Sequence, residues 1–373
     1  MSRLRVAHVV RRFGGLTEPF ILERVVGDRD QAELWTERLD QTVPGLAVRT
    51  VHVPWIAPGS IGERAFHRFP AIGPFLAGQY EAVERASSPD VIHAHYLTTG
   101  WLVGRRTTSP LVVSTYGFDA TAMPRRSGWR TAFRGLQQRA AVIVAEGPFM
   151  RQTLIDLGFD GDRVRVVPIA AGFERLTYRD PQPPEGALRV MSCGRLVEKK
   201  GHDGAIRAFA AAGLPGGSRL DIVGDGPMRA QLMRLATRLG LEGDVRFVGS
   251  LDRRSYLDHL ATIDLLIASS RTARNGDSEG GAPTTILDAQ SIGVPVIGSD
   301  HCDIPFLIED GVTGYLAAEG DDSALSDAIR RASDDRDQWP LVTRAGRAQV
   351  DRRHSGESVA ALVESIHHEA ARG

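Results

Sequence analysis

The sequence predicts an α/β protein built from two doubly wound domains, each with a parallel sheet. Short apolar runs typical of buried parallel strands alternate with amphipathic helical patterns along the 373 residues. A glycine turn follows the first run, and a proline-rich linker at residues 180–186 divides the chain into two halves. Each half is long enough to bury a core of its own.

The first half contains six apolar runs that predict strands. The first run leads into Gly14 and Gly15, and a helix opened by Thr17 follows. Strand, glycine turn and helix form the opening unit of a doubly wound domain, with the turn at the ligand-binding edge. A tight turn that binds nothing would have the same sequence. The six runs cover residues 6–10, 51–53, 90–95, 111–115, 140–144 and 164–168.

The second half repeats the strand–helix alternation after the linker. Strands are expected at residues 188–192, 220–223, 245–248, 265–268 and 294–297. The tail, residues 355–372, is amphipathic and predicts a helix. We therefore expect a domain over residues 1–182, a second over 187–350, and a terminal helical segment over 351–373.

Composition narrows the class of protein. The net charge of −1 gives no global attraction to nucleic acid. With two cysteines and no apolar leader or spanning run, we expect a cytoplasmic protein without disulfides. His93 and His95 end a predicted strand, but no third ligand stands at metal spacing, so no metal is expected. Residues 54–78 are expected to pack in the core; packing beside a cleft or contact with a membrane surface is the alternative. The oligomeric state stays open.

The stretch from residue 275 to 294 has the pattern of an anion site. Gly280, Gly281 and Ala282 leave little side chain near the backbone, and a helix should begin at Pro283. Exposed N–H groups at that helix end suit a phosphate. The carboxylates of Glu279 and Asp288 flank the site and could accept hydrogen bonds from sugar hydroxyls. A capped helix with solvated acids is the alternative.

The loop at residues 194–201 follows the first strand of the second half and is bounded by glycines. Arg195 can bind two phosphate oxygens at once, and Lys200 adds a point charge. Together they could neutralise a diphosphate leaving group, although a solvated basic turn would look similar. Gly224 opens a further turn that lacks the dinucleotide fingerprint, because Arg229 replaces its third glycine.

These motifs, taken in order, resemble the retaining nucleotide-sugar glycosyltransferases of family 4, which have the GT-B fold. The similarity covers nearly the whole chain and is most specific in the second half. It rests on Gly-Arg-Leu and Lys-Gly at 194–201, Ile-Val-Gly-Asp-Gly-Pro at 222–227, Phe-Val-Gly at 247–249, Glu-Gly-Gly-Ala-Pro at 279–283, Gly-Val-Pro-Val-Ile-Gly at 293–298 and Asp-Gly-Val-Thr-Gly-Tyr-Leu at 310–316.

The resemblance implies two Rossmann-like domains facing a cleft, with the last helix crossing back to the first domain. It implies that Arg195 and Lys200 bind the donor diphosphate, that Glu279 contacts the transferred sugar and that Asp288 contacts the ribose. Catalysis would also involve Tyr116 and Asp119. Further substrate contacts are expected at Gly14, Gly15, Gly224, Val248, Gly280, Gly281, Ala282, Thr284 and Thr285.

The chain departs from the family pattern in three places. Glu279 and Asp288 enclose eight residues where the family has seven, and the second acid is the shorter Asp. Tyr116 stands where the family has a histidine; it can hydrogen-bond a hydroxyl but cannot act as a cationic imidazole. Phe306 replaces an expected glutamate after Pro305. These changes indicate an unusual substrate or a weakened enzyme.

The sequence thus predicts a retaining glycosyltransferase that moves a sugar from a UDP- or GDP-sugar to a small-molecule or glycan acceptor, with no cofactor or metal. A catalytically weak nucleotide-sugar binding protein is the first alternative. A dinucleotide-dependent oxidoreductase is the second, and the missing third glycine counts against it.

Overall fold

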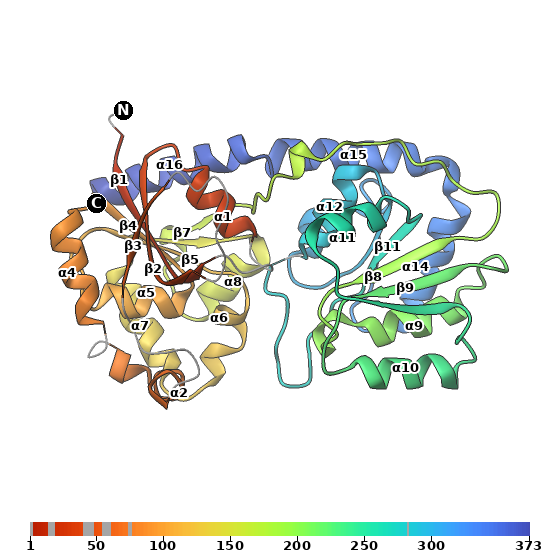
Figure 1. The fold of residues 1–373 in the computed structure, drawn as a ribbon, viewed down its shortest axis with the longest axis horizontal. Coiled ribbons are helices and arrows are strands. Elements are labelled where there is room, and N and C mark those ends of the chain that lie inside the picture. The colour runs from red at the N-terminus through yellow and green to blue at the C-terminus, as the bar shows by residue number, and fades with distance from the viewer. Residues whose placement is uncertain (1–2, 14–18, 40–47, 54–60, 74–76, 282) are drawn as a thin grey trace. The chain divides into compact units, whose positions relative to one another are not determined.

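The chain folds into two compact units, shown as a ribbon in Figure 1. Met1–Gly172 and Arg353–Gly373 form the first unit, and Phe173–Arg352 form the second. The change of unit therefore falls before the expected boundary at residue 182. This computed structural model describes residues 3–13, 19–39, 48–53, 61–73, 77–281 and 283–373. Gly14, Gly15 and Ala282 lie outside the described residues.

The first unit is built on a parallel sheet with strand order β3-β2-β1-β4-β5-β6-β7. Its strands are β1 (Arg5–Phe13), β2 (Gln31–Leu39), β3 (Arg49–His52), β4 (Val91–His95), β5 (Leu111–Ser114), β6 (Val142–Ala145) and β7 (Val164–Val166). Its helices include α1 (Pro19–Val26), α2 (Ile61–Arg68), α4 (Gly78–Ser87), α5 (Leu97–Gly104), α6 (Phe118–Thr121), α7 (Trp129–Arg139) and α8 (Pro148–Asp156). The six expected strands are present, and β2 is additional.

The last helix of the chain, α16 (Gly356–Arg372), completes the core of the first unit. Ser355 caps it by accepting a hydrogen bond from the Ser358 N–H at 3.2 Å. Its buried face carries Val359, Val363 and Ile366 at the spacing of one helix face, and these pack on the valines of the sheet. The tail is amphipathic because its apolar face is buried within this unit.

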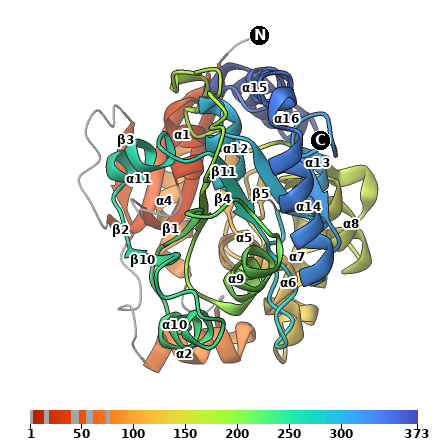
Figure 2. The ribbon, with the colours of Figure 1, turned by 90° about the vertical axis from the view of Figure 1, so that its right-hand side faces the viewer.

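The second unit is built on a parallel sheet with strand order β10-β9-β8-β11-β12-β13. Its strands are β8 (Arg189–Cys193), β9 (Arg219–Val223), β10 (Val245–Gly249), β11 (Leu265–Ala268), β12 (Val296–Ser299) and β13 (Tyr315–Ala317). Its helices are α9 (His202–Ala211), α10 (Arg229–Arg238), α11 (Arg253–Leu260), α12 (Thr284–Ile292), α13 (Ile304–Leu307), α14 (Asp322–Asp334) and α15 (Trp339–Arg353). Helices α9 and α14 lie side by side in Figures 1 and 2 and share one apolar core.

Sheet order locates the ligand-binding edge of each unit. In the second unit the order reverses between β8 and β11, and in the first unit it reverses between β1 and β4. Open parallel sheets bind ligands at such switch points, beyond the carboxyl ends of the strands. The loops that follow β8, β11 and β4 are therefore the first places to look for a site.

Two other sequence expectations can be compared with the fold. In residues 54–78, α2 buries Phe66 completely, whereas Phe69 is exposed, so this segment contributes at least one side chain to the core. Among the described residues, no helix is long and apolar enough to cross a bilayer.

Candidate active site

Backbone contacts hold three loops of the second unit together at the carboxyl edge of its sheet. The loops follow β8, β9 and β10, and they are joined by hydrogen bonds from Leu196 N–H to Asp225 O (2.9 Å) and from Gly224 N–H to Gly249 O (2.8 Å). Gly224 has φ +127°, and a Cβ there would lie 2.0 Å from Gly194 O. Gly224 is therefore needed for the packing of the loops, which is a sufficient reason for a glycine without any ligand.

The β8 loop also packs tightly on the loop that follows β11, across the switch point. Gly201 adopts φ +65°, and a Cβ at this position would lie 1.8 Å from Ser269 O. The Ser269 hydroxyl donates a hydrogen bond to Gly201 O at 2.9 Å. This contact fixes the predicted cationic loop against the segment that carries Glu279.

Lys200 and Glu279 form the central pair of this site. The Lys200 ammonium lies 2.9 and 3.0 Å from the two carboxylate oxygens of Glu279, and the Ser270 hydroxyl donates to the same carboxylate at 2.7 Å. Burial opposes the charge of Glu279, but attraction to Lys200 and Lys199 outweighs burial and lowers the pKa of this carboxyl. Two predicted site residues are thus brought together as a charged pair.

The adjacent Lys199 has a different role that the sequence did not reveal. Its ammonium is buried and donates to Ser278 O at 2.9 Å and to Asp277 at 3.2 Å. These bonds hold residues 277 and 278 against the β8 loop. The motif predicts a basic loop, but only the fold shows which lysine is structural.

Arg195 presents an exposed side chain from the same loop. Its carbonyl oxygen lies 3.3 Å from His202 Nε2, and Ser192 Oγ lies 2.8 Å from the other ring nitrogen. Burial lowers the pKa of His202 to about 4, so this imidazole is neutral near pH 7 and acts as a support for the loop. Within the described part of the chain, the Arg195 guanidinium has no carboxylate partner and is available to an anion.

Asp288 differs most from its expected environment. Its carboxylate is buried and makes two 2.6 Å hydrogen bonds with the Arg253 guanidinium. Burial raises the pKa of Asp288 in spite of this partner. Arg253 begins α11 and belongs to no motif, so sequence reasoning missed it. A ribose contact by Asp288 stays a prediction, and it would require sharing the carboxylate with Arg253 or displacing it.

The structure describes the residues predicted to bind phosphate before α12, except Ala282. Helix α12 begins at Thr284, so the expectation that Pro283 is its first helical residue is wrong by one position. Pro283 has ψ 130°, an extended conformation, and therefore caps the helix. Thr284 and Thr285 are half-buried in the first turn, while Gly280 has φ +78°. Gly281 is buried beside them, and Val248 is half-buried in β10.

In the first unit, Tyr116 and Asp119 occupy the loop after β5. Asp119 is buried, and its oxygens accept hydrogen bonds from Leu97 N–H (2.7 Å), Thr115 Oγ1 (2.8 Å) and Tyr116 N–H (3.1 Å). It thereby holds this loop and the start of α5 in place. Asp119 positions Tyr116, and a direct catalytic contact by Asp119 stays a prediction.

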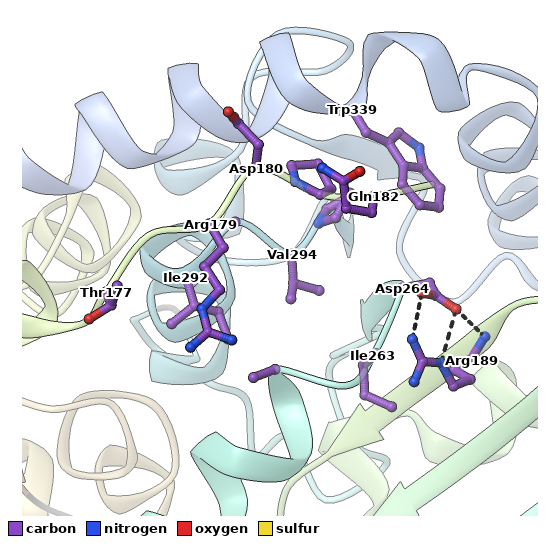
Figure 3. Close-up of a pocket in the computed structure, with 14 residues that line it drawn as sticks. Thr177, Arg179, Asp180, Gln182, Arg189, Ile263, Asp264, Ile292, Val294 and Trp339 are labelled. Carbon is purple, nitrogen blue, oxygen red and sulfur yellow. Dashed lines mark hydrogen bonds and ion pairs between the residues drawn. The ribbon is translucent and has the colours of Figure 1, made fainter. Parts of the chain in front are cut away.

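A cavity in the second unit lies at the opposite edge of the sheet from these loops (Figure 3). Its volume is about 290 Å³, and Arg189 and Asp264, which are paired in Figure 3, mark the amino ends of β8 and β11. No predicted site residue lines it. Because ligands of such sheets bind beyond the carboxyl ends, this cavity is not the candidate donor site.

The two halves of the chain match two family models. Residues 5–170 match the glycosyl transferase 4-like domain, and residues 175–349 match the glycosyl transferases group 1. Together the two matches cover most of the chain. The first lies within the first unit and the second within the second unit.

Individual relatives agree with these matches. An amylovoran biosynthesis glycosyltransferase of Erwinia amylovora is 34% identical over 199 residues, 53% of this chain and 49% of that protein. A GDP-mannose-dependent phosphatidylinositol monomannoside mannosyltransferase of Mycobacterium tuberculosis is 28% identical over 267 residues, 68% of each chain. This chain thus spans about half of the length of the Erwinia relative.

Solved structures support the fold. HepE of Anabaena, solved in complex with UDP and glucose, aligns over 97% of this chain and 99% of its own with a TM-score of 0.74 at 20% identity. A glycosyltransferase of Rickettsia africae aligns over 100% of both chains with a TM-score of 0.75 at 15% identity. The fold is therefore the GT-B class of two Rossmann-like domains. The chain belongs to the family 4-like glycosyltransferases.

Proposed function

We propose that the protein is a retaining glycosyltransferase that moves a sugar from a nucleoside-diphosphate sugar to a hydroxyl of a small-molecule or glycan acceptor. The observation that carries the proposal is the pairing of Lys200 with Glu279 beside the exposed Arg195, at the switch point of the second unit. Together these three side chains carry one positive charge, which suits a diphosphate.

The mechanism follows from the charges. Arg195 and Lys200 would neutralise the negative charge that grows on the departing diphosphate, and their loops are fixed before the donor arrives. Glu279 would contact the sugar while it keeps Lys200 oriented. Retention would then arise by attack on the face that the phosphate leaves, with the phosphate taking the proton of the acceptor.

The relatives guide the choice of donor. One is named as GDP-mannose-dependent, and HepE was solved with UDP and glucose. UDP- and GDP-sugars are therefore the donors to test first. A polysaccharide or lipid-linked glycan is the acceptor class to test, because the Erwinia relative is named for amylovoran biosynthesis and the Mycobacterium relative for a phosphatidylinositol mannoside.

The test is transfer from a panel of UDP- and GDP-sugars to such acceptors, followed by mass spectrometry of the products and NMR of the new anomeric centre. With the best donor, Arg195→Ala should lower kcat/KM by roughly 100-fold or more, because a charge that acts in the transition state is lost. Arg274→Ala removes an exposed arginine of the neighbouring segment and should leave the rate unchanged. Full activity of Arg195→Ala would refute the assigned role.

A nucleotide-sugar binding protein of low activity is the second candidate. Tyr116 favours it, because a tyrosine stands where the family has a histidine, and its hydroxyl is already engaged with His95 Nδ1 at 2.6 Å. Calorimetric binding of a donor, without turnover on any acceptor, would favour this candidate over the enzyme.

A further inference from the structure

Six side chains from distant parts of the first unit meet in its interior. They form the buried histidine cluster, which comprises His8 of β1, His93 and His95 of β4, His367 of α16, and Asp28 and Asp30 between α1 and β2. The side chains of His8, His367, Asp28 and Asp30 are no more than 1% exposed. The cluster lies outside the proposed transfer chemistry.

Ligand atoms of His8, Asp28 and His367 all lie within 4.8 Å of one another, and Asp30 approaches the group through His367. His8 Nε2 lies 2.7 Å from Asp28 Oδ2, and His367 Nδ1 lies 3.5 Å from both Asp28 Oδ2 and Asp30 Oδ2. The other oxygen of each carboxylate is already engaged by the backbone: Asp28 Oδ1 by Asp30 N–H at 2.9 Å, and Asp30 Oδ1 by Leu4 N–H at 3.0 Å. The Oδ2 atoms therefore point toward the two imidazoles.

Two buried polar atoms of the cluster make no hydrogen bond. They are His367 Nδ1 and Asp30 Oδ2, which lie 3.5 Å apart. A buried polar atom without a partner is costly, and a bound ion is one of the explanations for it in a native protein.

The chemistry of the cluster points to the kind of group. Imidazole nitrogens and carboxylate oxygens are ligands of zinc-class cations, and His8, Asp28 and His367 offer two of the first and one of the second. Arg24 is the nearby guanidinium, and it donates to Ser114 Oγ and Pro168 O instead of pairing with Asp28.

We propose that His8 Nε2, His367 Nδ1 and Asp28 Oδ2 bind a divalent metal ion of the zinc class. Two imidazoles and one carboxylate supply three of the four ligands that Zn²⁺ takes, and water would supply the fourth. Bonds of about 2.0–2.1 Å place tetrahedral ligand atoms roughly 3.3–3.4 Å apart, close to the observed 3.5 Å between His367 Nδ1 and Asp28 Oδ2. The 2.7 Å contact of His8 with Asp28 opens slightly as the ion replaces the proton on Nε2, which is released to solvent.

The remaining histidines complete the environment of the ion. Metal-bound imidazoles usually hydrogen-bond through their second nitrogen. Here His8 Nδ1 lies 3.1 Å from His95 Nε2, and His367 Nε2 lies 3.0 Å from His93 Nδ1. His93 and His95 therefore orient the ligands. The sequence assigns both as polar strand residues, and the expectation of a metal-free protein does not take account of positions 8, 28 and 367.

The ion would also set the direction of a hydrogen-bond chain that reaches Tyr116. Without metal, His8 Nε2–H donates to Asp28, so His95 donates to His8 and Tyr116 donates inward to His95 Nδ1 over 2.6 Å. With metal on Nε2, His8 donates to His95, and His95 donates to the Tyr116 oxygen. The Tyr116 hydroxyl proton can then point outward to a ligand.

The test begins with the untagged wild-type protein. We expect about one zinc-class ion per chain by elemental analysis, and the chelator-treated protein should melt at a lower temperature. Co²⁺ added to that protein should give the visible bands of a tetrahedral cobalt site. Wild-type protein that takes up neither Zn²⁺ nor Co²⁺, and whose melting ignores both ions, would overturn the proposal and leave a cluster held by protons alone.

Variants then identify the ligands. Asp28→Asn keeps the shape of the side chain and should lose the stoichiometric ion and the cobalt bands. His368→Gln changes the neighbouring histidine of α16, outside the cluster, and should keep both. A wild-type cobalt spectrum in Asp28→Asn, or its loss only in His93→Gln, would refute this ligand set. If Asp28→Asn fails to fold by circular dichroism, the wild-type titration still decides.

Discussion

Lys199 and Lys200 are neighbours in the sequence with unlike environments. Lys199 is buried and bonded to the 277–278 segment, whereas Lys200 is paired with the Glu279 carboxylate. The Lys200 side chain is 19% exposed and the Glu279 side chain 9% exposed, so their interaction is only weakly screened. Removing one partner leaves the other as a poorly compensated charge.

This pair gives a test by double-mutant cycle. We expect Lys200→Met to lower the free energy of unfolding by about 2–3 kcal/mol, because Glu279 loses its counterion. Glu279→Gln in the same chain should recover part of the loss, with a coupling of roughly 1 kcal/mol or more. Urea denaturation of the wild type, both single variants and the double variant measures it; strictly additive effects would contradict the coupling.

Glu37 of β2 predicts a pH dependence of stability. Burial raises the pKa of this carboxyl to about 7, although Arg11 and Tyr80 hydrogen-bond to it. The folded pKa is above the unfolded value, so the contribution of Glu37 is fully present below the unfolded pKa and is lost as pH rises through 7. The loss is at most about 3 kcal/mol.

Thermal unfolding from pH 4.5 to 8.5 checks this expectation. Glu37→Gln should flatten the decline of Tm between roughly pH 5 and 8, because the amide does not ionise. Glu81→Gln, which removes an exposed carboxylate of α4, is the control. A variant Glu37→Gln with the full wild-type decline would show that other groups cause it.

Sequence reasoning at the residue scale identified side chains that act through local motifs. Lys200 and Glu279 were assigned to one anion site, and the fold brings them within hydrogen-bond distance. Arg253, His8 and His367 were missed, because their partners lie far away in the sequence and no spacing connects them. Such constellations become visible only when sheet order and helix packing are known.

Loops that pack backbone against backbone are the main feature at the scale of elements. Gly224 and Gly201 are the points of closest approach, where any Cβ would collide with a carbonyl oxygen. Both also have positive φ, so a side chain would add backbone strain. The edge of the second sheet is therefore rigid before a ligand binds.

A glycine substitution measures that rigidity. Gly224→Ala should destabilise the protein by about 2–4 kcal/mol, since the new methyl group lies 2.0 Å from Gly194 O at φ +127°. Gly243→Ala has no atom within 4 Å and should change stability by no more than about 0.5 kcal/mol. Chemical denaturation compares the two; equal stability would mean that the loops adjust freely.

Strands were predicted well where they are apolar and poorly where they are mixed. The expected strand at residues 265–268 is β11 (Leu265–Ala268), a run buried at every position. Strand β2 was missed because Gln31, Glu33, Glu37 and Arg38 interrupt its apolar pattern, and only its middle is buried. Strand β13 (Tyr315–Ala317) is three residues long and was not among the expected strands. Both β2 and β13 form strands because they pair with neighbouring strands, and no local sequence pattern encodes that pairing.

At the scale of the whole molecule, the first unit is discontinuous in sequence. Its core includes Val359, Val363 and Ile366 of α16, which are separated from the rest of the unit by all of Phe173–Arg352. Burial of three such side chains contributes roughly 5–9 kcal/mol. That amount is comparable with the total stability of a typical domain, about 5–15 kcal/mol.

A chain that stops after Arg353 should therefore lose the fold of its first unit while the second unit survives. Limited proteolysis with mass spectrometry should find a resistant fragment close to residues 173–352 and none from residues 3–172. A point variant gives a milder version: Val363→Ser should lower stability, and Leu362→Ser, at an exposed position of the same helix, should not. Survival of the first unit without α16 would contradict the argument.

The same discontinuity constrains how the protein is made. On the ribosome, residues 3–172 emerge first, yet the helix that covers one face of their sheet is translated only after the entire second unit. Until α16 is synthesised, the first unit exposes Val6, Val91, Val112 and Val142, which α16 covers in the folded protein. The second unit is continuous in sequence and can fold as soon as it leaves the ribosome. We therefore expect chaperones that bind apolar surface to bind the first unit before α16 is synthesised.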